Sequence, residues 1–132
     1  MPRVYRKGVR GRSTVSSWQI YHNPRCSKSR QTLALLQENG VEPEIREYLK
    51  KAPTVAELKT LITMLNAEAS DVVRSGEAVY KELGFKDKPP SSADLIEAIA
   101  ANPILLERPI VVHGNQAVIG RPPENVLALI ND

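Results

Sequence analysis

The chain of 132 residues contains a single cysteine, Cys26. One thiol forms no disulfide within its own chain, so the disulfide-rich class of secreted domains is excluded. Two histidines, far apart in the sequence, are too few to complete a zinc site of the usual nitrogen and sulfur ligands. If Cys26 performs redox chemistry, the second sulfur has to come from another molecule.

Several other signals are missing. No apolar run approaches the roughly 18 residues of a membrane-spanning helix, and the basic N-terminus lacks the apolar stretch of a secretory signal. Neither a glycine-rich phosphate loop nor a paired-carboxylate signature is found. The composition, 42% hydrophobic and 25% charged, is ordinary for a globular domain. We therefore expect one cytoplasmic domain without a membrane partner.

Positive charge is concentrated at the N-terminus. The formal net charge is +3, but residues 1–17 hold five basic side chains and no acidic one. Removing these five from 18 leaves 13 basic against 15 acidic residues in 18–132. The segment 1–17, rich in arginine, glycine and serine, predicts a disordered extension. An arm for nucleic acid or an anionic surface is one interpretation. We favour an inert extension or a mis-assigned start, and we expect no nucleic-acid partner.

The rest of the chain, 18–132, predicts one α/β domain. Apolar periodicity and turn residues predict strands at 18–21, 44–49, 110–113 and 116–119, and helices at 27–39, 54–65, 91–101 and 124–130. Gly114-Asn115 is a hairpin turn, and Thr54 with Glu57 forms a capping box. A βαβ unit and a hairpin together predict a four-stranded mixed sheet flanked by helices. Shorter helices in 67–84 would form a helical insertion, with core candidates Val72, Val73, Val79 and Leu83.

The segment His22-Asn23-Pro24-Arg25-Cys26-Ser27-Lys28-Ser29-Arg30 is the strongest candidate site. It joins the first predicted strand to the first predicted helix. A helix N-terminus offers unpaired N–H groups and partial positive charge, which bind anions and lower the pKa of a cysteine placed there. Arg25, Lys28 and Arg30 add positive charge. The pattern predicts a thiolate nucleophile aimed at a bound oxyanion, rather than an inert buried thiol.

Other polar residues have open roles. His22 is compatible with orienting or deprotonating Cys26 and equally with a structural role. Ser29, three residues after Cys26, is placed to donate to the sulfur or to serve as polarity in the first helical turn. His113, beside the hairpin turn, is expected to be a solvated residue.

Two arginines precede prolines at the ends of the predicted hairpin, in Arg108-Pro109 and Arg121-Pro122. A residue before proline is held extended or in a turn, and loops at strand ends commonly carry binding residues. The planar guanidinium suits a tetrahedral oxyanion because it donates two parallel hydrogen bonds. By spacing alone both arginines are also compatible with surface charge, and Arg74 has less to distinguish it.

Taken together, three landmarks resemble the glutaredoxin-coupled arsenate reductase family. Tyr21 to Arg30 resembles its active-site motif, Glu107-Arg108-Pro109-Ile110-Val111-Val112 its second landmark, and Gly120-Arg121-Pro122-Pro123-Glu124 its third. Arg74, with Tyr80 six residues later, matches the segment that carries a further arginine. The resemblance spans residues 18 to about 130.

The resemblance implies a thioredoxin-like fold with a cis Arg108-Pro109 peptide. It implies that Cys26 is the nucleophile, that His22 modulates it and Ser29 is a partner of the thiolate. Three arginines would bind arsenate or a similar oxyanion: Arg74, Arg108 and Arg121. Glutathione would add to the arsenylated cysteine, and a glutaredoxin would release arsenite. A monomer with no metal and no tightly bound cofactor is expected.

The chain departs from the resistance enzymes of that family. Gly120 stands where these often have cysteine, Ser75-Gly76 lacks a basic residue often seen after the arginine, and the C-terminus is short. These features resemble a chromosomal branch, which leaves physiological arsenate turnover open.

Two alternative functions remain. A general thiol-disulfide or glutathione-linked oxidoreductase of the same fold would keep Cys26 but would not need an arginine clamp. A related RNA-polymerase-binding regulator uses a Cys-x-x-Cys switch. That switch does not form in Cys26-Ser27-Lys28-Ser29.

Overall fold

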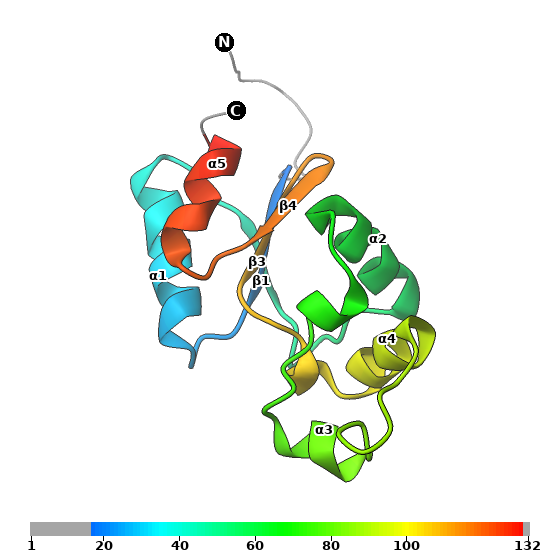
Figure 1. The fold of residues 1–132 in the computed structure, drawn as a ribbon. Coiled ribbons are helices and arrows are strands. Elements are labelled where there is room, and N and C mark those ends of the chain that lie inside the picture. Colours follow the sequence, from blue (N-terminus) through cyan, green and yellow to red (C-terminus); the bar gives the residue numbers. More distant parts are fainter. Residues whose placement is uncertain (1–16, 131–132) are drawn as a thin grey trace.

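The computed structural model describes residues 17–130 and shows a four-stranded sheet between two layers of helices (Figure 1). The strands are β1 (Trp18–His22), β2 (Glu44–Glu47), β3 (Ile110–His113) and β4 (Gln116–Ile119). The α-helices are α1 (Ser27–Glu38), α2 (Val55–Leu65), α3 (Ala78–Glu82), α4 (Ser92–Ala101) and α5 (Leu127–Ile130). Short 3₁₀ helices are η1 (Ala69–Asp71), η2 (Pro103–Leu105) and η3 (Pro123–Val126).

The sheet is mixed, as the sequence predicted. Its strand order is β2-β1-β3-β4. β1 and β2 are parallel and joined through α1, whereas β3 is antiparallel to both β1 and β4. Because β1 and β3 are antiparallel, the loop after β1 and the segment before β3 lie at the same end of the sheet.

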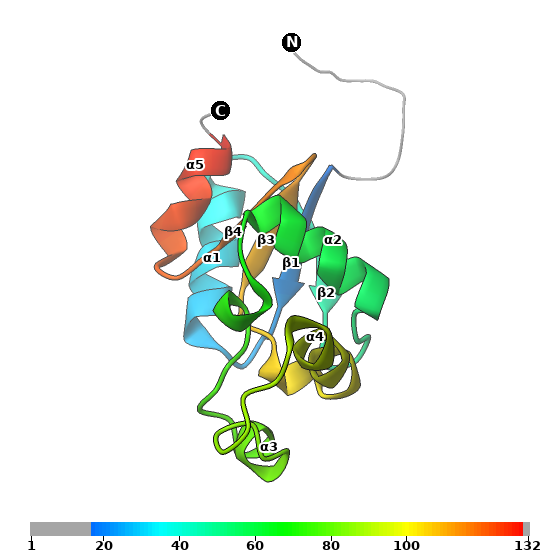
Figure 2. The ribbon, with the colours of Figure 1, turned by 45° about the vertical axis from the view of Figure 1, so that its right-hand side comes forward.

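The two faces of the sheet are covered by different helices, with α1 and α5 on one face and α2 and α4 on the other (Figures 1 and 2). Strand residues alternate between two buried clusters, because successive side chains of a strand point to opposite faces. Ile20 and Val111 pack with Leu36 of α1 and with α5. Their neighbours Tyr21 and Ile110 pack in the larger cluster with α2 and α4. Both faces are therefore buried, as expected for a sheet with a helical layer on each side.

The local signals at turns and caps are confirmed. Gly114 in the β3–β4 turn has φ +62°, a conformation that glycine adopts readily. Thr54 and Glu57 form the reciprocal capping box of α2, and the Ser91 hydroxyl caps α4 by accepting from a backbone N–H. The Arg108-Pro109 peptide is cis, and so is Arg121-Pro122, which had not been predicted.

Several boundaries differ from those predicted. β2 ends at Glu47, and the predicted last helix begins as the 3₁₀ helix η3, whose N-cap Pro122 and first residue Pro123 have no donor N–H. The region 67–84 contains only η1 and the short α3. Leu83, placed in the core by the sequence, is 44% exposed because it ends a helix too short to bury a full face.

His113 also differs from the prediction of a solvated hairpin residue. It pairs with Trp18 across β1 and β3, and the two rings stack with centroids 3.9 Å apart. The predicted extension 1–17 lies, apart from Ser17, outside the described residues. Within residues 17–130 no helix is long and apolar enough to cross a membrane.

Arg46 of β2 and Glu57 of α2 join the sheet edge to its helical cover. Their side chains form a bidentate pair with N···O distances of 2.6 and 3.0 Å, and the Arg46 guanidinium also lies over the Tyr21 ring. Hydrogen bonds from Arg46 lower the pKa of Glu57 to about 2, with the backbone N–H of Thr54 as the next cause. The Arg46 side chain is 9% exposed, so removing its partner leaves a nearly buried charge.

We predict that Glu57→Gln lowers the free energy of unfolding at pH 7 by about 1–2 kcal/mol, the range of one charged hydrogen-bonded pair with its cap. The pKa of Glu57 is depressed in the folded state. Its contribution is therefore present above the unfolded value near 4.5 and is lost as the pH falls toward 2. Urea unfolding of both proteins between pH 7 and 3 measures this effect.

The difference between the two proteins should narrow as the pH falls below about 5. Glu97→Gln, on the exposed side of α4, makes the same chemical change without a buried partner. A pH-independent difference, or an equal loss in Glu97→Gln, would contradict the account of this pair.

Candidate active site

The loop between β1 and α1 places Cys26 at the N-cap of the helix. Its backbone is extended, with φ −93° and ψ 123°, and the residue is partly exposed. The first N–H groups of a helix have no partner within it and carry partial positive charge, so they favour a negative group there. The first turn of α1 contains no acidic residue. The thiolate therefore has no competing carboxylate in the first turn of its own helix.

Asn23 shapes the loop that presents the cysteine. Its Oδ1 accepts from the Arg25 N–H at 3.0 Å, and its carbonyl accepts from the Cys26 N–H at 3.0 Å. Arg30 reaches back from α1 and donates to the Pro24 carbonyl at 3.0 Å. These three hydrogen bonds fix the direction in which the Cys26 side chain leaves the loop.

His22 and Ser29 contact each other beneath this loop. The Ser29 Oγ and the His22 Nδ1 are 2.6 Å apart, and Oγ also accepts from the Asn23 N–H at 3.1 Å. Burial lowers the pKa of His22, partly opposed by Glu47 and aided by Arg30, so the ring is neutral near pH 7. The pair ties the end of β1 to the first turn of α1. The Ser29 hydroxyl thus contacts His22 and Asn23, and the Ser29 backbone N–H is the group that acts on the Cys26 sulfur.

Tyr48 supports the loop from the end of β2, and the sequence analysis did not single it out. Its side chain is fully buried, and its hydroxyl bonds to the side chain of Asn23. Burial raises the pKa of Tyr48 to about 12, against an opposing effect of Arg108. The residue therefore stays neutral. Its one signal in the sequence is a tyrosine at a strand end, where a buried hydroxyl needs a partner.

The pKa of the Cys26 thiol is lowered. Burial opposes ionisation and would raise it, but the backbone N–H of Ser29, the Arg108 side chain and the backbone N–H of Lys28 outweigh that effect. The helix start and one arginine thus act on the same sulfur. This is the setting in which a cysteine becomes a nucleophile.

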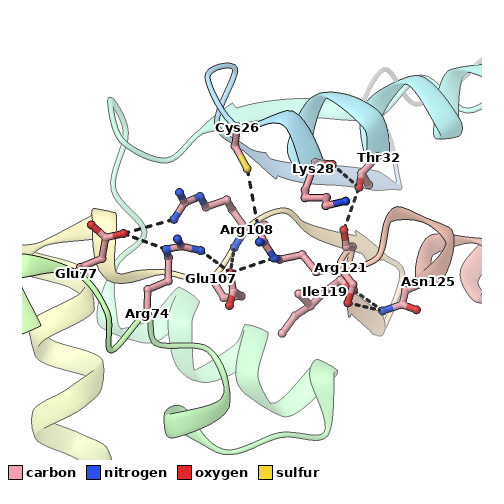
Figure 3. A network of polar contacts seen from close by, with 11 residues as sticks. Cys26, Lys28, Thr32, Arg74, Glu77, Glu107, Arg108, Ile119, Arg121 and Asn125 are labelled. Carbon is pink, nitrogen blue, oxygen red and sulfur yellow. Dashed lines mark hydrogen bonds and ion pairs between the residues drawn. The ribbon is translucent and has the colours of Figure 1, made fainter.

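Three arginines from distant segments lie in one cluster on one side of the cysteine, and they are the three that the family resemblance assigned to the site (Figure 3). Arg74 follows η1, Arg108 precedes β3, and Arg121 follows β4. The Nη1 of Arg121 lies 3.9 Å from the Cys26 Sγ and donates to the Arg108 carbonyl at 3.3 Å.

Arg74 reaches the site through a short backbone pairing between the helical region and the segment before β3. Val73 and Leu106 form an isolated antiparallel bridge. The Arg74 N–H donates to the Leu105 carbonyl and the Glu107 N–H to the Val72 carbonyl, each at 2.7 Å. This bridge was not predictable from the sequence, because neither segment alternates as a strand.

Arg121 is held by close packing at Gly120. The Gly120 N–H donates to the Pro109 carbonyl at 2.9 Å, and its own carbonyl accepts from the Thr32 hydroxyl at 3.2 Å. A Cβ at position 120 would lie 2.7 Å from the Thr32 Oγ1 and 3.0 Å from the Pro109 Cγ. Asn125 also fixes the turn by donating to the Arg121 carbonyl at 3.2 Å. The glycine thus allows β4 to approach α1 closely enough to aim Arg121 at the sulfur.

Two nitrogens of the Arg108 guanidinium have no hydrogen-bond acceptor in the described part of the chain. Its Nε and Nη1 are buried without a hydrogen-bond partner among residues 17–130. The nearest carboxylate oxygen, on Glu77, is 4.0 Å from Nη1. Buried N–H groups are rarely left unpaired, so these two point to an acceptor that enters the site.

Two carboxylates, Glu77 and Glu107, stand among the arginines. Neither residue was given a role from the sequence. Each of the two side chains is 24% exposed and paired with Arg74, through Nε for Glu77 at 3.1 Å and Nη1 for Glu107 at 3.0 Å. A glutamate three residues after Arg74 and another directly before Arg108 are the signals that were available.

The arrangement combines one thiol of lowered pKa with a cluster of three arginines. Among residues 17–130 no group of three or more histidine, cysteine, aspartate or glutamate side chains is arranged to hold a metal ion. The chemistry open to these side chains is attack by the sulfur on an oxyanion that the guanidinium groups bind.

Comparisons with known proteins agree with this geometry. The ArsC family matches residues 21–129. An uncharacterized protein, YfgD, of Escherichia coli K12 is 51% identical over 85% of this chain and 95% of its own length. An arsenate reductase of Haemophilus influenzae is 45% identical, covering 84% and 97%. A solved arsenate reductase from Vibrio cholerae superposes with a TM-score of 0.82 at 48% identity, covering 87% and 98%. The fold is thus that of the ArsC proteins, which is thioredoxin-like.

We predict that Gly120→Ala displaces Arg121 and lowers kcat/KM about tenfold, because the added methyl group overlaps Thr32 and Pro109. Overpacking of this kind costs about 1–3 kcal/mol of stability. Steady-state kinetics and thermal unfolding measure the two effects.

Gly76→Ala is the matched control, since a Cβ there meets nothing within 4 Å. It should behave as the unchanged protein in both measurements. Equal behaviour of the two variants would show that close packing at Gly120 does not position Arg121.

Proposed function

Since the chain belongs to the ArsC family, we propose that it is an arsenate reductase in which Cys26 is the nucleophile. An oxyanion is the substrate class of this family. One observation carries the proposal: Arg74, Arg108 and Arg121 form one cluster in which Arg121 lies beside the Cys26 sulfur and two buried N–H groups of Arg108 are unpaired among the described residues.

Binding comes first. Arsenate is a tetrahedral anion, and planar guanidinium groups donate paired hydrogen bonds to adjacent oxygens of such an anion. Arg108 supplies donors in the buried part of the site, and Arg121 supplies donors beside the sulfur. Screening of the arsenate charge by the arginines lets a negative sulfur approach the arsenic.

The first chemical step is attack by the Cys26 thiolate. A sulfur–arsenic bond forms and one arsenic–oxygen bond breaks, with the oxygen leaving as hydroxide or water, so arsenic remains in the pentavalent state. The lowered pKa of Cys26 supplies the thiolate for this step. His22 and Ser29 support it by holding the first turn of α1, whose Ser29 N–H stabilises the negative sulfur.

Reduction requires external thiols, because the chain has one cysteine. Glutathione replaces a second oxygen on the arsenic, which leaves as water. A glutaredoxin thiolate then attacks the glutathione sulfur and forms a mixed disulfide. The electron pair of the broken sulfur–arsenic bond stays on arsenic, which becomes trivalent, and water releases arsenite from Cys26. Two thiols are oxidised and one arsenic is reduced by two electrons.

We place this reaction in the cytoplasm, where glutathione keeps thiols reduced. Every side chain of the proposed site comes from one chain, so a monomer suffices. The proposed reaction uses glutathione as a co-substrate and no tightly bound cofactor.

The test is arsenate-dependent oxidation of NADPH, coupled through glutathione, glutathione reductase and a glutaredoxin. We expect turnover that disappears when arsenate or glutaredoxin is omitted. Cys26→Ser should abolish it, because a serine hydroxyl is far too weak a nucleophile at neutral pH. Arg108→Gln should lower kcat/KM about 10²-fold, the size of losing one charged donor in an active site.

Lys59→Gln removes one positive charge from the exposed side of α2 and should leave kcat/KM unchanged. Retained turnover in Cys26→Ser would refute the mechanism. Absence of turnover in the unchanged protein, with disulfide substrates still reduced, would favour a general thiol reductase instead.

A further inference from the structure

We propose that Glu107 is a positioning residue of the oxyanion site, acting through Arg74 and Arg121. This inference rests on the proposed function, since it concerns how the three arginines are aligned for the reaction. A carboxylate in an anion-binding site looks unfavourable, because its charge repels the ligand. The contacts of Glu107 explain why it is there.

A single oxygen of Glu107 lies at the junction of all three arginines (Figure 3). Its Oε1 accepts from the Arg74 Nη1 at 3.0 Å and from the backbone N–H of Arg108 at 3.1 Å. The Nε of Arg121 lies 3.9 Å from the same oxygen. Arg74, Arg108 and Arg121 come from three segments distant in sequence, so this oxygen fixes their relative places.

The backbone holds Glu107 in position for this role. Its N–H donates to the Val72 carbonyl at 2.7 Å, within the same short bridge that brings Arg74 to the site. The side chain is 24% exposed, so water screens its contacts only in part. The backbone of Glu107 therefore fixes the position from which its carboxylate contacts the Arg74 and Arg121 side chains.

Arg74 shows what the alignment achieves. Glu107 accepts a hydrogen bond from the Arg74 Nη1, and Glu77 accepts one from the Arg74 Nε at 3.1 Å. Among the described residues, Nη2 is the nitrogen of Arg74 that no carboxylate engages. Two carboxylates thus set the plane of this guanidinium and leave one nitrogen for an incoming oxyanion.

The net charge of the cluster also supports a positioning role for Glu107. Three arginines and two glutamates leave one net positive charge, which the Cys26 thiolate cancels. Attraction by net charge is then weak, and the site depends on the direction of its hydrogen bonds. Glu107→Gln raises the net charge by one while it releases Arg74 and Arg121. It should weaken catalysis without weakening anion binding.

The experiment compares Glu107→Gln with the unchanged protein in the coupled arsenate assay, with phosphate as inhibitor. We expect kcat to fall about tenfold or more, while phosphate inhibits equally well or better. A merely structural defect would weaken both. A kcat within about twofold of the unchanged protein, or a parallel loss of phosphate inhibition, overturns the proposal.

A double-mutant cycle tests whether Glu107 acts through Arg74. In an Arg74→Gln background, Glu107→Gln should cost a smaller factor in kcat/KM than in the unchanged protein. Equal factors would show that Glu107 does not act through this arginine. Glu38→Gln, at the exposed end of α1, is the matched charge control.

Two further measurements keep the test decisive. If Glu107→Gln does not fold, Glu107→Asp keeps the charge but shortens the reach, and a kcat equal to that of the unchanged protein overturns the proposal. If the protein does not reduce arsenate, the proposed function fails, and protection of Cys26 from iodoacetamide replaces turnover. Phosphate should then protect Cys26 of Glu107→Gln at least as well as it protects Cys26 of the unchanged protein, and weakened protection overturns the proposal.

Discussion

A thiolate that is partly withdrawn from water needs positive charge close to it, and several positive groups held together need negative groups to space them. Both requirements meet at Cys26. The N-terminus of α1 and Arg108 lower the pKa of the sulfur, and Arg121 lies beside it. Glu77 and Glu107 hold the arginines apart and in place. We therefore expect that removing the arginines or the glutamates changes the position of the remaining side chains or the ionisation of Cys26.

The fold supplies these groups from separate parts of the chain. β1 leads directly into the Cys26 loop. Arg108 precedes β3 and Arg121 follows β4, at the same end of the sheet as that loop. The region between α2 and β3 contributes Arg74 through the bridge of Val73 with Leu106. The helical insertion is therefore part of the candidate site and not an appendage to the sheet.

Much of this was predictable from the sequence, because the relevant signals are local. The strand alternation, the Thr54 capping box and the Gly114 turn each depend on a few neighbouring residues. The position of Cys26 at a helix start follows from the same kind of signal. The resemblance to a family, rather than any pattern, assigned Arg74 to the site.

The remaining features depend on distant segments meeting. Glu107 meets Arg74 across a backbone pairing without strand character, and Glu77 lies 4.0 Å from Arg108 of a distant segment, so local spacing did not assign either glutamate to the site. The close approach at Gly120 and the hydrogen bond between the side chains of Tyr48 and Asn23 also exist only in the folded chain. The prediction that Leu83 is buried was wrong for a local reason. A regular apolar spacing was assigned to a helix that is only about one turn long.

The most direct test of the central claim is the rate at which iodoacetamide modifies Cys26, measured against pH with and without arsenate. The chain has one thiol, so the reaction reports on this sulfur alone. The account predicts a thiol pKa below the ordinary value of 9.0 and protection that rises with arsenate concentration. A thiol that titrates at its ordinary value, or one that arsenate leaves unprotected, would contradict it.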